Sequence, residues 1–229
     1  MKIGGFQKFS LIDYPDKICA IIFTQGCNFR CPYCHNPELA NPRLFETCIA
    51  EEDVVSFLEK RKGKLDAVSI TGGEPTLQDD LVDFITKLKS MTYLVKLDTN
   101  GSHPAVLEVL LQNELLDYIA MDVKAPPRKY QSVTRSEINP AVIQRSIDLV
   151  RNASIPYEFR TTVVKSQLDE KDLLTIGRQL KNARQYVLQK FVPAKTLDPR
   201  FSRAKTYSDD EFAVLRKKLM KHVDNVIVR

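Results

Sequence analysis

Residues 18–34 read ICAIIFTQGCNFRCPYC, and this stretch decides the fold. Its first part, residues 18–24, is a nearly continuous apolar run, which is typical of a parallel strand buried on both faces. Its second part places Cys27, Cys31 and Cys34 on one short loop with the spacing Cys-x3-Cys-x2-Cys. A buried strand that leads into a cysteine loop predicts an α/β protein with its site at the carboxyl ends of the strands.

The three loop cysteines predict a metal centre. Three thiolates can hold three irons of a cubane 4Fe–4S cluster and leave the fourth iron open. Structural zinc is the competing interpretation, but it takes four ligands, and His35 directly beside Cys34 is poorly placed to close a tetrahedron. A disulfide framework is not expected in a chain of this length with five cysteines and no secretory segment. Cys19 and Cys48 are expected to be structural.

Length and composition predict one domain. The chain has 229 residues, of which 43% are hydrophobic, enough for a sizeable core. No run of about 18 apolar residues is present, so no membrane span is expected. The amino terminus is too short and too polar for a signal peptide, which favours a cytoplasmic location. We expect a single domain over residues 1–229, with a core at about 18–193 and a carboxyl-terminal helix and tail at 194–229.

Strand and helix patterns alternate along the chain. Strands are expected at residues 18–24, 65–71, 93–98, 118–123, 157–164 and 186–192, with a short terminal strand at 226–228. Helices are expected at residues 51–62, 79–91, 104–113, 140–151, 169–182 and 208–222. Six strands, each followed by a helix, require crossovers of one hand and close only part of an eight-stranded barrel.

The cysteine loop and its flanks resemble a known family. With DYPDK at 13–17, FTQGCN at 23–28 and CHNP at 34–37, the chain is similar to the radical S-adenosylmethionine (SAM) superfamily, and within it to the glycyl-radical-enzyme activases. The likeness is strongest to activating proteins of anaerobic ribonucleoside-triphosphate reductases and next to pyruvate formate-lyase activating enzymes. It covers about residues 1–193, and it implies a radical SAM core, a partial (β/α)6 TIM-like barrel.

The second predicted strand ends at Thr71, followed by Gly72, Gly73, Glu74 and Pro75. Two glycines allow a close backbone approach, and a strand edge with a carboxylate can receive an amino group. A plain turn with a solvated glutamate is the alternative. The resemblance implies that these four residues after the threonine bind the amino group of SAM.

The third predicted strand ends at Asp98, Thr99 and Asn100. These residues are strong turn formers, so a simple turn is an open alternative. The resemblance implies that their oxygens reach the ribose or the sulfonium of SAM.

The fourth predicted strand ends at Asp122 and Lys124, which lie two apart and therefore point the same way. A structural ion pair is one interpretation. The resemblance implies instead a place in the active site, near SAM and the incoming glycine loop, where related activases also hold a monovalent cation.

Three further residues complete the predicted site. Arg160 lies among apolar strand residues, where an unpaired charge is costly, so it needs a carboxylate partner from the protein or from SAM. Gln189 stands about where pyruvate formate-lyase activating enzymes place a histidine, a departure from that branch. Tyr33 is expected to cover the cluster and exclude solvent.

Charge is unevenly distributed. Residues 1–150 carry 17 Lys and Arg against 20 Asp and Glu, whereas residues 151–229 carry 17 against 9. A basic final third attracts acidic partners, such as a flavodoxin or ferredoxin-type electron donor, although a plain solvated surface is the simpler interpretation. No nucleic-acid motif accompanies it, so a nucleic-acid partner is not expected.

The resemblance implies an oxidoreductase that cleaves SAM reductively to a 5′-deoxyadenosyl radical. The radical would take hydrogen from a glycine of a partner, a glycyl radical enzyme such as anaerobic ribonucleotide reductase. Two alternatives stay open: a radical SAM enzyme acting on a small molecule, similar to 7-carboxy-7-deazaguanine synthase, and a non-catalytic zinc or nucleic-acid-binding module.

Overall fold

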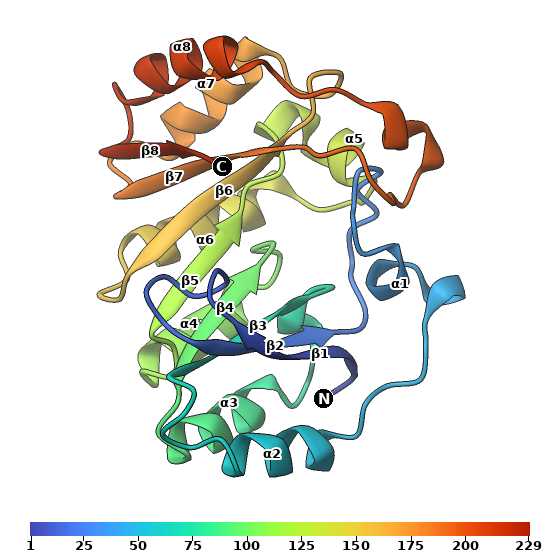
Figure 1. The fold of residues 1–229 in the computed structure, drawn as a ribbon. Coiled ribbons are helices and arrows are strands. Elements are labelled where there is room, and N and C mark those ends of the chain that lie inside the picture. The colour runs from blue at the N-terminus through green and yellow to red at the C-terminus, as the bar shows by residue number, and fades with distance from the viewer.

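The computed structural model describes residues 1–229, and its strands form one sheet in the order β1 to β8. Strand β1 pairs antiparallel with β2, and every later neighbour is parallel. The sheet curves without closing, with β1 and β8 at its two edges (Figure 1). This confirms the predicted partial barrel. The strands are β1 Ile3–Ser10, β2 Cys19–Thr24, β3 Ala67–Gly72, β4 Leu94–Thr99, β5 Tyr118–Asp122, β6 Tyr157–Val163, β7 Gln185–Lys190 and β8 Asn225–Val228.

Most helices lie outside the curved sheet, along its convex side, whereas the short α1 lies beside the cysteine loop (Figure 1). They are α1 Pro37–Ala40, α2 Glu51–Glu59, α3 Leu81–Ser90, α4 Pro104–Gln112, α5 Tyr130–Thr134, α6 Pro140–Arg151, α7 Glu170–Gln179 and α8 Asp209–Leu219. Asp169 and Ser208 each cap a helix through a reciprocal capping box, at the ends of the chain segments that lead into α7 and α8. None of the helices is long and apolar enough to cross a membrane.

The predicted six parallel strands correspond to β2–β7, but the prediction missed β1. Residues Ile3–Ser10 hold two glycines and several exposed side chains, so they show no clean alternation of apolar and polar residues. Antiparallel pairing with β2, which the local pattern does not encode, makes them a strand. The expected terminal strand is present as β8 and extends the parallel order by one.

Successive side chains of each strand point to opposite faces of the sheet, and this alternation separates two clusters of buried residues. One face of the sheet packs with the helices in a cluster of 48 buried residues. The other face, inside the barrel, holds a small cluster in which Tyr14 packs on Tyr118, with ring centroids 5.8 Å apart, and on the fully buried Cys19. Tyr14 belongs to the loop after β1, so that loop fills the amino end of the barrel and leaves the carboxyl end for the site.

Candidate active site

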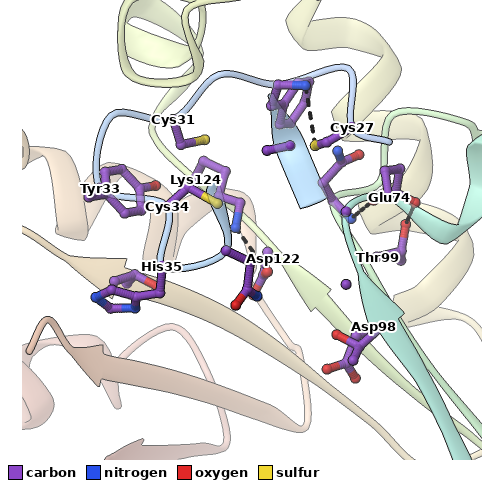
Figure 2. A pocket seen from close by; sticks show the side chains of 18 of the residues that line it. Cys27, Cys31, Tyr33, Cys34, His35, Glu74, Asp98, Thr99, Asp122 and Lys124 are labelled. Atoms are coloured by element: carbon purple, nitrogen blue, oxygen red, sulfur yellow. Dashed lines mark hydrogen bonds and ion pairs between the residues drawn. The ribbon is translucent and has the colours of Figure 1, made fainter. Parts of the chain in front are cut away.

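A cavity of about 200 Å³ lies at the carboxyl ends of β2–β6, and the empty space amounts to about 840 Å³ when its open mouth is included. Figure 2 shows the cysteine loop on one side of it and acidic and basic side chains from the strand ends on the other. All but two of the predicted site residues line it: Cys27, Cys31, Tyr33, Cys34, Gly72, Gly73, Glu74, Asp98, Thr99, Asn100, Asp122, Lys124 and Arg160. Pro75 and Gln189 do not.

Backbone hydrogen bonds hold the cysteine loop in place. Gly26 donates to the carbonyl of Leu39 at 2.8 Å, and Arg30 donates to that of Thr134 at 2.8 Å. Cys31 is buried, while Cys27 is half-buried. Burial raises the pKa of Cys27 to about 12 and that of Cys31 to about 11. The thiolate forms therefore need a compensating positive charge, which metal ligation supplies.

The donor set fits an open cluster better than a single ion. No three His, Cys, Asp or Glu side chains are grouped closely enough to hold one metal ion. His35 is engaged elsewhere, since its ring stacks on Phe191 and its Nε2 lies 3.0 Å from the Val192 carbonyl oxygen. A cubane takes its thiolates on different irons and so needs a wider spacing than zinc does. The hydroxyl of Tyr33 is buried in this wall without a hydrogen-bond partner, as a polar atom facing an absent group would be.

Gly72 and Gly73, which precede Glu74, allow the backbone after β3 to contact the backbone after β2. Gly73 donates to the Thr24 carbonyl at 2.8 Å, and the next amide, of Glu74, donates to that of Gly26 at 2.8 Å. A Cβ on Gly73 would lie 2.0 Å from the Gly26 carbonyl oxygen. Gly72 has a φ of +111°, a conformation that L side chains rarely adopt. These bonds join the segments that follow β2 and β3, through the kind of close backbone approach that two glycines allow.

Glu74 is fixed by its neighbours. Its side chain is 1% exposed, so the alternative of a solvated glutamate is wrong. The Oε1 atom accepts hydrogen bonds from the Thr76 amide at 3.1 Å and the Thr99 hydroxyl at 2.7 Å, and the Oε2 atom accepts one from the Asn100 amide at 2.6 Å. Burial raises the pKa of Glu74, and these bonds oppose the rise. The Oε2 atom accepts no other bond from the chain and keeps capacity for one more donor.

Thr99 and Thr76 therefore position the Glu74 carboxylate by donating hydrogen bonds to it. The Thr99 hydroxyl is taken up by Glu74 and by the Gly101 amide at 3.1 Å, so its oxygen is less available to SAM than the motif suggested. Asn100 instead links the end of β4 to the cysteine loop, since its side-chain Nδ2 donates a hydrogen bond to Asn28 Oδ1 at 3.0 Å. Thr76 was not predicted, because nothing in its local sequence shows which carboxylate it contacts.

Alternating charges cross the barrel interior from β4 to β6. Arg160 donates from Nε to Asp122 at 3.0 Å and from Nη1 to Asp98 at 3.1 Å. Lys124 donates to Asp122 at 2.9 Å, and Lys96 pairs with Asp98. The carboxylate partners expected for Arg160 are thus protein groups. Burial alone would raise the pKa of Asp122, but Arg160 and Lys124 hold it at about 2.

Lys96 was missed by sequence reasoning. It is a lysine within an apolar strand, two residues before Asp98, and that spacing is the signal that could have revealed it. Gln189 lies beside the cavity on β7, where it contacts the Thr162 hydroxyl at 3.4 Å. Pro75 begins a short 3-10 turn, Pro75–Leu77, that supports Glu74 from behind.

Comparison with known proteins gives consistent matches. Residues 21–176 match the Radical SAM superfamily. The "Putative glycyl-radical enzyme activating enzyme" of Methanocaldococcus jannaschii is 37% identical over 99% of this chain and 95% of its own length. A pyruvate formate-lyase-activating enzyme of Clostridium pasteurianum is 27% identical over 86% of this chain and 83% of its own.

A solved structure shares the fold at low identity. The crystal structure of SuiB from Streptococcus suis superimposes with a TM-score of 0.69 at 13% identity. The match covers 91% of this chain, and this chain spans about half, 48%, of that one.

Proposed function

Because this chain belongs to the Radical SAM superfamily, we propose that it is a glycyl-radical-enzyme activating enzyme. The observation that carries the proposal is the meeting of the three cysteines and Glu74 on one cavity at the strand ends. The relatives in Methanocaldococcus jannaschii and Clostridium pasteurianum, both named for activation, support it.

The family uses a 4Fe–4S cluster and SAM, and the residues present fit both. We assign Cys27, Cys31 and Cys34 as the cluster ligands. When bound, the cluster and SAM together supply a 5′-deoxyadenosyl radical that removes hydrogen from a glycine. The protein's part is to hold the ligands in place, orient SAM and exclude water, and the buried Tyr33 serves the last purpose.

Glu74 is assigned to the amino group of SAM. Four hydrogen bonds fix its carboxylate: two from the amide and the hydroxyl of Thr76, one from the Thr99 hydroxyl and one from the Asn100 amide. The Oε2 atom has a remaining acceptor site. Gly72 and Gly73 keep the neighbouring backbone close to the cysteine loop. Thr99 is a positioning residue in this proposal, since it acts through Glu74.

Asp122 and Lys124 are assigned to the part of the cavity that receives the partner's glycine loop. Arg160 holds Asp122 ionised, and Asp122 in turn orients the Lys124 ammonium. Both Asp122 oxygens already have a cationic partner, so a monovalent cation is not part of the proposal. Asp98 balances the other end of Arg160 and lines the SAM side of the cavity.

We propose anaerobic ribonucleotide reductase as the partner, on the motif likeness of residues 13–37. A cluster held by the three cysteines would supply one electron to SAM, so a flavodoxin or ferredoxin-type donor that replaces this electron belongs to the same proposal. An oxygen-labile cluster also requires a reducing compartment, for which the cytoplasm is the expected place.

The test is electron paramagnetic resonance of anaerobically reconstituted, dithionite-reduced protein. We expect a reduced-cubane signal that changes shape when SAM is added. Mixing with an anaerobic ribonucleotide reductase should then give a glycyl radical signal on the reductase. The Cys31→Ala variant should lose the cluster signal, while the Cys48→Ala variant, at an exposed cysteine, should keep it.

Stoichiometric zinc with no cluster signal would contradict the enzyme proposal and favour a zinc module. A SAM-responsive cluster without radical transfer to the reductase would retain the radical SAM site and exclude that partner. Turnover of a small molecule by such protein would then favour the alternative class of radical SAM enzymes.

A further inference from the structure

Residues 191–206, which we call the strap, run from the end of β7 across the cysteine loop before returning to α8 (Figure 1). The Leu197 amide donates to the Cys34 carbonyl at 3.0 Å, and the Asp198 amide donates to the Pro32 carbonyl at 2.9 Å. These bonds fasten the strap to the outer side of the loop. The backbone of the strap is therefore hydrogen-bonded directly to the backbone of a predicted cluster ligand, Cys34.

The strap is strongly cationic. Lys195, Arg200, Arg203 and Lys205 are all exposed, and Asp198 is its one acidic residue. Asp198 binds two guanidinium groups, from Arg200 at 2.7 Å and from Arg135 at 2.8 Å, whose side chains are 79% and 44% exposed. Asp198 offsets one of these positive charges and Glu38 offsets another, through Lys195 at 2.9 Å, so that the strap and Arg135 together keep an excess of positive charge. The basic final third of the chain places a local positive patch beside the cysteine loop.

An apolar spot accompanies this charge. Val192 is 63% exposed at the start of the strap, where its carbonyl receives the His35 ring. Charges at the rim of a protein interface mainly set the association rate. The arrangement fits an acidic protein surface better than a nucleic acid strand, since no exposed aromatic side chain of the strap offers a base-stacking platform.

We propose that the strap is the docking surface for an acidic one-electron carrier protein. The inference rests on the proposed function, because only a redox cluster at the cysteine loop needs such a carrier. One electron leaves the carrier's reduced cofactor, and the cluster gains it, so the carrier is oxidised and the cluster reduced by one electron each. Docking on the outer side leaves the cavity, on the other side of the loop, free for SAM and the partner's glycine.

The test measures how fast the cluster is reduced. A flavodoxin in its hydroquinone form is mixed anaerobically with reconstituted protein, and cluster bleaching is followed by stopped flow at several salt concentrations. In the Arg200→Glu/Arg203→Glu variant we expect reduction at low salt to slow by about tenfold or more, since charge steering is worth that much. The salt dependence should also flatten.

Three controls keep the result interpretable. Reduction by methyl viologen radical should be unchanged, which shows that the cluster is intact. The Lys217→Glu/Lys221→Glu variant, which we call the α8 control, makes the same charge change on two exposed lysines, one in the last turn of α8 and one just after it, and should behave as wild type. The Arg200→Gln/Arg203→Gln variant removes the charges without placing a carboxylate beside Asp198, and it should show a smaller loss in the same direction.

Equal flavodoxin rates in the strap variants and in the α8 control would overturn the docking proposal. The proposal would also be overturned if flavodoxin reduced the cluster of the strap variants at the normal rate while these variants no longer formed the glycyl radical on the partner. That result would assign the strap to the glycyl radical partner. Retention of DNA or RNA by wild type but not by the strap variant, with normal reduction, would assign it to nucleic acid. Failure of the wild type to hold a cluster would instead disprove the proposed function.

Discussion

Gly73 lies where the exit of β3 crosses the cysteine loop, and its missing side chain is what lets the two backbones meet. A Cβ there would lie 2.0 Å from the Gly26 carbonyl oxygen, which also accepts the bond from the Glu74 amide. We expect Gly73→Ala to push Glu74 away from the loop and to cost about 3 kcal/mol of unfolding free energy. Urea unfolding measures the cost, and loss of the SAM-induced change in the cluster signal measures the displacement.

The matched control is Gly63→Ala. Unlike Gly73, Gly63 has a positive φ, +73°, but no atom lies within 4 Å of its added Cβ. It should lose only about 1 kcal/mol and keep the SAM response. Equal losses in the two variants would mean that the close approach to the Gly26 carbonyl oxygen adds no cost beyond that of replacing an uncrowded glycine.

At the residue scale, sequence reasoning selected residues that line the cavity where the signal is local. The cysteine spacing and the glycine pair with Glu74 are both contained within a few residues, and both fall on the cavity. Thr76 and Lys96 were missed because each matters through a contact decided by the fold. Thr99 was identified, but its hydroxyl faces Glu74, a contact between strands that spacing along one strand does not encode.

Strands β4, β5 and β6 each contribute charges to the ion network, and Arg160 is its centre. Its side chain is 12% exposed and contacts both Asp98 and Asp122. Arg160→Met would leave two carboxylates largely buried without their shared partner, and we expect a loss of about 3 kcal/mol in urea unfolding. The control Lys218→Met breaks an exposed pair with Glu170 and should cost under about 1 kcal/mol. Similar small losses in both would show that the network adds no stability.

The same network predicts acid sensitivity. The folded-state pKa of Asp122 is about 2, below its ordinary value of 3.8, because Arg160 and Lys124 outweigh the opposing effect of burial. A lowered pKa stabilises the folded state at pH values above the ordinary pKa of the group. This stabilisation is lost as the pH falls from about 4 towards 2. For Asp122 the amount is about 2 kcal/mol. Urea unfolding at a series of pH values should show this loss in wild type and a reduced slope in Asp122→Asn; equal slopes would contradict the assignment.

At the scale of elements, the strand–helix alternation was predictable because strands such as β2, β3 and β5 are largely buried and are mostly apolar in sequence. Strand β1 was not, since it is an edge strand with exposed residues that pairs only with β2. Single helices ended a few residues earlier than expected, as α2 does at Glu59, because amphipathic patterns continue past the last helical hydrogen bond.

Over the whole molecule, the barrel and the cysteine loop depend on different interactions. The main core of 48 buried residues is built from strands and helices, and the cysteine segment contributes only Phe29, Cys31 and Tyr33 to it. The loop is otherwise fastened by single hydrogen bonds, which include the side-chain bond from Asn100 to Asn28 and the backbone bonds from the strap to Pro32 and Cys34. Sequence reasoning could not foresee the strap's position, since nothing local in residues 191–206 points to a loop some 160 positions away.

This division predicts what cluster removal does. After anaerobic chelation of the iron, we expect the barrel to stay folded, with unchanged far-ultraviolet circular dichroism and protected amides in β3–β6. Amide exchange should rise about tenfold or more in residues 26–41 and in the strap, because their few bonds open locally once the ligands are released. Hydrogen exchange with mass spectrometry measures both regions in one sample, and α6 serves as the internal reference. Loss of protection throughout the strands would contradict the division and make the cluster part of the folding core, as zinc is in small metal-dependent domains.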